Sequence, residues 1–192
     1  SKNLIARDKV RYEGQAVAAI AATTLRQAKK AAAEILVQYQ ELPHVITIDE
    51  AMSEDAPLVH EDLLTEGLDS EPSKPSNIAK RNFFEQGDIE AGFAQADHVF
   101  ENEFNTKVVH QGYIEPHACV ADTSRDGRSE IWCSSQGHFM VRSATAGVLG
   151  WETSKIKVIP AEIGGGFGGK TTIYLEPLAV KLSEKADRPV KM

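Results

Sequence analysis

The chain has 192 residues, of which 42% are hydrophobic and 26% are charged, and its formal net charge is −7. This composition is typical of a globular protein and excludes a fibrous or wholly disordered chain. The acidic balance argues against nucleic acid and against an anionic membrane as main partner, because both bind clustered Lys and Arg. No run of residues approaches the roughly 20 apolar positions of a membrane span.

The first 43 residues predict one supersecondary unit, in the order strand, helix, strand. The apolar run 15–22 is β-like, residues 25–36 carry apolar positions at helical spacing, and residues 35–40 form a second β-like run. Thr24 has the side chain of a helix N-cap. The unit is too small for a complete domain, so we expect its remaining strands to come from elsewhere.

The composition changes over residues 53–76, which are rich in acidic residues, proline and serine. Such a segment is typical of a linker or a long surface crossing. We therefore predict a partial domain over 1–52, a linker over 53–76 and the first part of a second domain over 77–192.

The second part predicts a mixture of strands and helices. Asp88 can cap a short helix through Phe93, an Arg125-Asp126-Gly127 turn marks a hairpin, and Gly150 ends an amphipathic helix. The expected strands are 77–84, 97–109, 117–123, 129–134, 156–163 and 190–192, and the expected later helices are 138–149 and 177–186.

The two cysteines, Cys119 and Cys133, each lie in an apolar run, without a second Cys or a His at metal-finger spacing. We interpret them as buried thiols of a reducing compartment, which predicts a cytoplasmic location.

A glycine run at residues 164–170, Gly-Gly-Gly-Phe-Gly-Gly-Lys, is the most unusual segment. Its backbone amides are open to close approach by an anionic group. With Thr171 it also satisfies the nucleotide-binding pattern G-x-x-x-x-G-K-[ST]. Against a nucleotide hydrolase, Pro177 fits the first turn of the next helix, which should otherwise begin at Lys170. A nucleotide-binding protein and a non-catalytic assembly module stay open as alternatives.

Gln136 lies between the predicted strand ending near Cys133 and the helix beginning at His138. A neutral amide at that position can donate a hydrogen bond without bringing a charge, beside amides freed at a helix N-terminus. A simple cap or turn residue is the alternative interpretation.

Several motifs, in the same order along the chain, together resemble the molybdenum-binding subunit of the xanthine dehydrogenase/aldehyde oxidase family, the molybdenum hydroxylases. The motifs are residues 8–19, 37–43, Gly87-Asp88 with Phe93 and 96–99, Tyr113-Ile-Glu-Pro, Gln136, Leu149-Gly150, 164–170 and 188–191. The resemblance implies an α+β fragment: the C-terminal part of an α/β hammerhead domain, then the first part of a mixed α/β molybdopterin-binding domain.

The resemblance also implies roles for residues. Gly165, Gly166, Phe167 and Gly168 would lie against a molybdenum–pyranopterin cofactor, and Gln136 would donate to the apical oxo ligand of the metal. No residue of this chain would ligate the metal directly. The catalytic base of the family, a glutamate, would lie downstream, so the chain would contain no catalytic residue and would be inactive alone.

The implied reaction is hydroxylation of an aldehyde, purine or N-heteroaromatic small molecule with oxygen from water. Electrons would pass to iron–sulfur clusters and FAD on partner subunits or domains, and the remainder of the molybdenum subunit would be a further partner. Members that oxidise xanthine carry Glu directly after the loop lysine. Thr171 stands there in this chain, which favours an aldehyde or N-heteroaromatic substrate.

Glu115 is a further carboxylate of interest, either as a substitute acid–base group or as a structural residue at a strand entry. His110, Glu115 and His117 could in principle bind a metal, but their irregular spacing would not place all three on one strand or helix face.

Overall fold

The computed structural model describes residues 4–192, which form two compact units. One unit comprises the residues up to 37 together with 107–192, and the other comprises residues 38–106. Within residues 4–192, no helix is long and apolar enough to cross a membrane.

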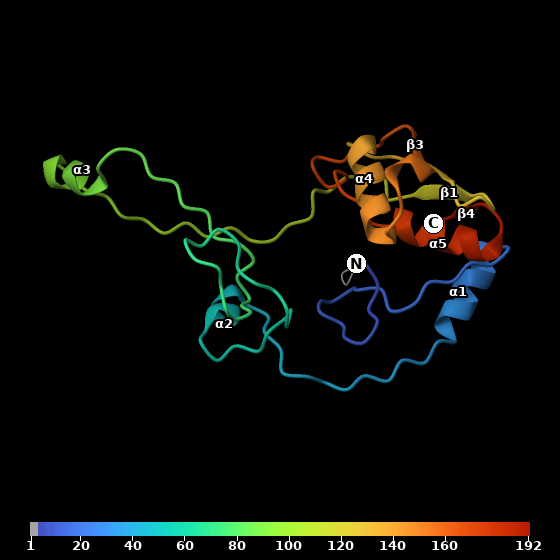
Figure 1. The fold of residues 1–192 in the computed structure, drawn as a ribbon, viewed down its shortest axis with the longest axis horizontal. Helices are drawn as coiled ribbons and strands as arrows, with labels where there is room; N and C mark the ends of the chain where they lie inside the picture. Colours follow the sequence, from blue (N-terminus) through green and yellow to red (C-terminus); the bar gives the residue numbers. More distant parts are fainter. Residues whose placement is uncertain (1–3) are drawn as a thin grey trace. The chain divides into compact units, whose positions relative to one another are not determined.

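The first unit contains a four-stranded sheet with strand order β3-β2-β1-β4 (Figure 1). The strands are β1 (Cys119–Thr123), β2 (Ser129–Cys133), β3 (Ile156–Pro160) and β4 (Val190–Lys191). β1 pairs antiparallel with β2 and with β4, whereas β2 pairs parallel with β3. The hairpin turn is closed by hydrogen bonds between Ser124 and Arg128 and between Gly127 and Ser124, as its sequence predicted.

Helices α4 (His138–Leu149) and α5 (Glu176–Ala186) contact the sheet and each other (Figure 1). Alternate side chains of β1 and β2 are buried, because successive residues of a strand point to opposite faces. The core formed in this way contains Cys119, Ala121, Ile131, Cys133, Val141, Ala146, Ile156, Ala179 and Val180. α4 and the short 3-10 helix η1 (Thr153–Lys155) connect the parallel strands β2 and β3.

The end of α4 and the start of α5 agree with the sequence prediction. Gly150 follows α4 with φ of 68°, the left-handed conformation that glycine adopts at low cost. Pro177 lies in the first turn of α5, where its missing N–H is not needed. The hairpin, α4, β3, α5 and β4 are therefore confirmed, and the α+β class is confirmed with them.

The two cysteines are free, buried and directly opposite each other on β1 and β2. Burial raises the pKa of Cys119 to about 12 and that of Cys133 to about 11. Both thiols therefore stay protonated at neutral pH and behave as apolar core groups, which confirms the interpretation of buried thiols.

The N-terminal residues contain helix α1 (Leu25–Ala33), and Thr24 accepts a hydrogen bond from the Gln27 amide at its start. The strands predicted over 15–22 and 35–40 are wrong, because both segments have irregular backbone. A strand is stabilised by the hydrogen bonds of a partner strand. Neither segment has one within the described residues, and an isolated bond from the Ala6 amide to the Ala16 carbonyl joins the backbone there.

The second unit contains two short helices. α2 (Ile48–Met52) was not predicted and has a capping box formed by Thr47 and Glu50. α3 (Ile89–Gln95) was predicted and is capped by the Asp88 carboxylate. Asn77 closes residues 51–77 into a loop by accepting from the Val59 amide and donating to the carbonyls of residues 51 and 57.

The strands predicted over 77–84 and 97–109 are also wrong. Their backbone is irregular, apart from an isolated bridge between Glu66 and Lys80. The reason is the same as at the N-terminus, since an alternating sequence cannot form a ladder without a neighbouring strand.

Candidate functional site

The glycine run and Gln136 lie at the same edge of the sheet. β2 ends at Cys133 and leads through Ser134 and Ser135 into Gln136, and β3 ends at Pro160 and leads into the glycine run. β2 and β3 are parallel neighbours, so their carboxyl ends meet at one edge. In sheets with parallel strands, ligands bind outside the carboxyl ends of the strands.

The backbone of the glycine run follows a path that few residues can adopt. Gly165 and Gly168 have φ of 91° and 87°, and Phe167 between them has φ of 48°. Left-handed residues within a short run are typical of concave backbone that binds anions through its amides. The Phe167 side chain is 73% exposed, so the core does not explain its presence.

The Gln136 side chain is held by the run. Its Oε1 accepts from the amides of Gly168 at 3.0 Å and Lys170 at 3.1 Å, and its own backbone amide donates to the Lys170 carbonyl at 2.9 Å. Two N–H donors on one side-chain atom identify that atom as the oxygen. The Nε2 group therefore stays available as a donor, and it has no protein acceptor within residues 4–192.

Three successive amides of the run are also available. The amides of Gly165, Gly166 and Phe167 donate to no protein acceptor within the described residues, whereas those of Gly164 and Gly168 are engaged by side chains. The site thus presents uncharged N–H donors from the backbone and from Gln136 at one edge of the sheet.

The run packs against its neighbours so closely that side chains would not fit. A Cβ on Gly166 would lie 2.5 Å from Gln136 Oε1, and one on Gly169 would lie 2.6 Å from Tyr113 Cε1. A Cβ on Gly164 would lie 2.8 Å from the Glu115 Cβ. Contacts this short force a displacement, so packing requires these three glycines, whereas φ favours glycine at 165 and 168.

Lys170 is turned inward. Its side chain is 1% exposed, forms an ion pair with Glu115, and lies 4.9 Å from the centre of the Tyr113 ring. A lysine that binds nucleotide phosphates must reach the ligand, and the helix of such a loop should begin beside it. Here α5 begins at Glu176. The nucleotide-binding alternative is therefore not favoured.

Glu115, His110 and His117 contact other protein groups and do not form a shared metal site. The Lys170 ammonium, and then the Gly164 amide, hold the pKa of Glu115 below its usual range. Burial, followed by the Lys170 charge, lowers the pKa of His117, whose Nε2 is 2.7 Å from the Tyr113 hydroxyl. Among the residues that the structure describes, no group of three or more His, Cys, Asp and Glu is arranged to hold a metal ion.

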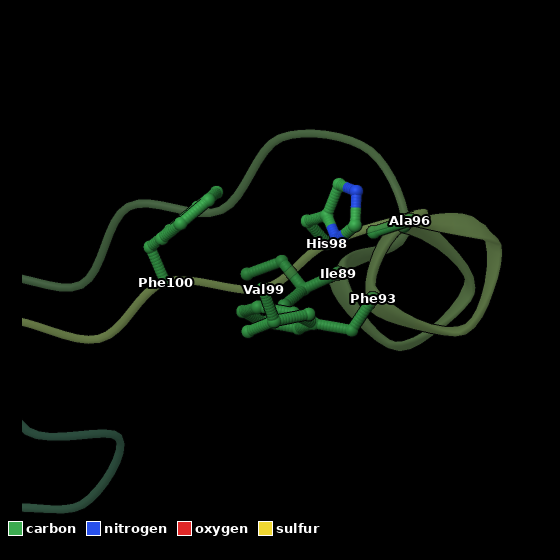
Figure 2. A pocket seen from close by; sticks show the side chains of 7 residues that line it. Ile89, Phe93, Ala96, His98, Val99 and Phe100 are labelled. Atoms are coloured by element: carbon green, nitrogen blue, oxygen red, sulfur yellow. The ribbon is translucent and has the colours of Figure 1, made fainter.

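A separate apolar hollow lies in the second unit, around α3. It is lined by Ile89, Gly92, Phe93, Ala96, His98, Val99 and Phe100, and Figure 2 shows the side chains of Ile89, Phe93 and Val99 close together beside the helix. Its side chains are apolar apart from the imidazole of His98, so it lacks the convergent polar side chains of a chemical site.

Sequence reasoning missed the side chains that support the glycine run. Gln111 and Tyr113 lie against Gly169, and the Ser135 hydroxyl donates to the Lys170 carbonyl at 3.1 Å. These residues and Glu115 lie on an irregular segment in which Gly112 has φ of 76°, and the side chains at 111, 113 and 115 all contact the run. Nothing in the sequence indicated that this segment packs against the glycine run.

Comparisons with known proteins identify the family of the chain. A family model described as "Molybdopterin cofactor-binding domain" matches residues 70–192, and one described as "Aldehyde oxidase and xanthine dehydrogenase, a/b hammerhead domain" matches residues 1–43. The chain therefore belongs to the aldehyde oxidase and xanthine dehydrogenase family of molybdopterin-binding proteins, which confirms the resemblance seen in its motifs.

Individual relatives give the same result. The chain is 34% identical to the nicotinate dehydrogenase large molybdopterin subunit of Eubacterium barkeri, over 96% of this chain and 40% of that protein. It is 33% identical to the xanthine dehydrogenase of Emericella nidulans, over 96% of this chain and 12% of that protein. The chain thus spans less than half the length of these curated relatives.

Solved structures share the fold. Quinoline 2-oxidoreductase from Pseudomonas putida 86 superposes with a TM-score of 0.73 at 26% identity, covering 88% of this chain and 20% of that one. CO dehydrogenase from Oligotropha carboxidovorans superposes with a TM-score of 0.70 at 30% identity, covering 87% and 21%.

Proposed function

We propose that this chain supplies one wall of the cofactor site in a molybdenum hydroxylase. The observation that carries the proposal is the set of uncharged donors at the carboxyl ends of β2 and β3. The Gln136 Nε2 group and the amides of Gly165, Gly166 and Phe167 lie at that edge without a protein acceptor in the described chain.

These donors fit a molybdenum–pyranopterin group. Such a group is rich in acceptor oxygens and carries an anionic phosphate, and both are stabilised by fixed N–H donors close to the backbone. Gly166 allows the Gln136 side chain to pack against the run, because a Cβ there would lie 2.5 Å from Gln136 Oε1. Gly168 contributes close backbone approach rather than donation, because its amide already binds Gln136.

The cofactor, when bound, supplies the two-electron chemistry of substrate hydroxylation with oxygen from water. The residues described here bind and orient it. Gln136 supplies a hydrogen-bond donor to the cofactor. The glycine run has no bulky side chains apart from Phe167 and the inward-turned Lys170, so the cofactor can approach its backbone closely. A catalytic base from a segment beyond this chain completes the reaction.

For the substrate, we favour an aldehyde or an N-heteroaromatic compound over a purine. Thr171 follows the loop lysine where xanthine-oxidising members carry Glu, and its hydroxyl donates to the Gly168 carbonyl at 2.9 Å. Threonine has no carboxylate that could bind a purine, and its hydroxyl is already bonded to the run. The names of two relatives, a nicotinate dehydrogenase and a quinoline oxidoreductase, support the N-heteroaromatic class.

The remaining assignments complete the proposal. Residues 1–52 belong to the hammerhead domain, 53–76 form the linker and 77–192 begin the cofactor-binding domain. Iron–sulfur and FAD components accept the electrons, and the protein works in the cytoplasm.

The test uses the complete molybdenum subunit with its partners. Gln136→Ala should lower the molybdenum and pterin content, or the turnover of a substrate panel, by roughly tenfold or more, as loss of a group that orients a metal site does. Gln95→Ala, an exposed glutamine in α3, is the matched control. Unchanged metal content together with unchanged turnover in Gln136→Ala would refute the proposal.

A further inference from the structure

One carboxylate joins the two ends of the glycine run. Glu115 Oε2 accepts from the Gly164 amide at 2.7 Å and also forms the ion pair with the Lys170 ammonium. Gly164 is the first residue of the run and Lys170 is the last. The loop between them, which contains the three free amides, is therefore closed through a side chain from a distant segment.

The ion pair is shielded on the lysine side. Lys170 is 1% exposed and is covered by the Tyr113 ring, while the Glu115 side chain is 30% exposed. A buried ammonium without its carboxylate would be an uncompensated charge, which is strongly unfavourable. Lys170 is also fixed through its backbone, because its amide and carbonyl bond Gln136.

The segment that carries Glu115 is shaped to support the run. Gln111 and Tyr113 lie against Gly169, Tyr113 also lies against Gly165, and Glu115 lies against Gly164. The backbone of this segment is irregular, with φ of 76° at Gly112, and this path brings the three side chains against the run. The side chains of these three residues therefore pack against the run, and Glu115 is the one among them that carries a charge.

We infer that Glu115 is a positioning residue that clasps the two ends of the glycine run and so fixes the orientation of its free amides. This inference rests on the proposed function, because it assigns those amides to the cofactor. Glu115 acts through Gly164 and Lys170, and it neither touches the substrate nor transfers a proton.

Hydrogen exchange of the complete molybdenum subunit tests the clasp. Glu115→Gln removes the charge but keeps the size of the side chain, so the hydrogen-bonded amides of the run (Gly164, Gly168, Gly169 and Lys170) should exchange at least about tenfold faster while β2 and α4 keep their protection. The molybdenum content should fall in the same variant. Glu130→Gln is the matched control, because Glu130 forms an exposed ion pair with Lys157 at 2.7 Å.

A second variant covers the case in which Glu115→Gln fails to fold. The double change Glu115→Leu with Lys170→Met removes both charges, so no charge is left buried, but the Gly164 amide still loses its acceptor. We expect a folded subunit whose run still exchanges faster than that of the native protein. Native protection of residues 164–170 in this variant, or in a folded Glu115→Gln, would overturn the clasp.

The readouts separate the clasp from the proposed function. Gln136→Ala should release the Gly168 and Lys170 amides but leave the Gly164 amide protected, because Glu115 holds the latter. Faster exchange in Glu115→Gln with unchanged molybdenum content would support the clasp and contradict the assignment of the run to the cofactor. Unchanged exchange would refute the clasp whatever the molybdenum content.

Discussion

Two segments of this protein have alternating apolar and polar residues but adopt different structures. Residues 119–133 form a hairpin in which Ile131 is fully buried, whereas residues 97–109 have the alternation of a strand but an irregular backbone, with Val108 fully exposed. The hairpin has a partner strand on each side, and helix α5 packs against both of its strands. An alternating pattern therefore specifies a strand only where a partner strand and a covering layer are present.

The largest expected effect is a difference in unfolding free energy between one substitution in the hairpin and one in residues 97–109. Ile131→Ala should lower the free energy of unfolding by roughly 2–5 kcal/mol, because it leaves a cavity in the core. Val108→Ala should change it by less than about 0.5 kcal/mol. Urea unfolding of the chain measures both, and equal effects would mean that residues 97–109 are packed in solution.

The second comparison places the same substitution in two environments. Gly166→Ala should destabilise the chain by roughly 1–3 kcal/mol, because its Cβ would lie 2.5 Å from Gln136 Oε1. Gly147→Ala, on the open surface of α4, should stabilise by roughly 0.5–1 kcal/mol, because alanine favours the helix. Thermal unfolding of the two variants should therefore shift in opposite directions. A stabilising Gly166→Ala would contradict the packing of the run.

Helix α1 provides a weaker contrast with α4. α1 buries none of its side chains, whereas α4 buries Val141, Thr145 and Ala146. Thr24→Ala removes the N-cap of α1 and should cost about 1 kcal/mol of helix stability. We expect lower helical ellipticity without loss of the sheet. Unchanged ellipticity would show that α1 is held by contacts other than its cap.

The smallest effect is a pH dependence within the packed unit. The pKa of His117 is lowered from its usual 6.5, mainly by burial, so the unfolded chain takes up a proton first as the pH falls. Stability should therefore decrease below about pH 6.5, and His117→Asn should flatten this dependence. Urea midpoints measured between pH 7 and pH 5 test it. A native chain whose stability rises as the pH falls over that range would contradict the burial of His117.

The sequence predicted the elements whose neighbours are close along the chain. The hairpin, α4, β3 and α5 follow one another, so their turn and cap residues agree with their apolar patterns. The segments 15–22 and 35–40 carry similar patterns without partners, and local sequence cannot reveal that. At the site, the glycine run was recognisable because its residue types are unusual, whereas Gln136 could equally be a cap or turn residue and was singled out by the family resemblance. Tyr113 and the clasp by Glu115 depend on tertiary contacts between distant segments.

The central claim is that Gln136 and the glycine run form one wall of the molybdopterin site. A crystal structure of the molybdenum-loaded protein that contains this chain tests it most directly. The account predicts that Gln136 Nε2 and at least one amide among Gly165, Gly166 and Phe167 lie within hydrogen-bond distance of the cofactor. A cofactor bound elsewhere, with these donors facing solvent, would contradict it.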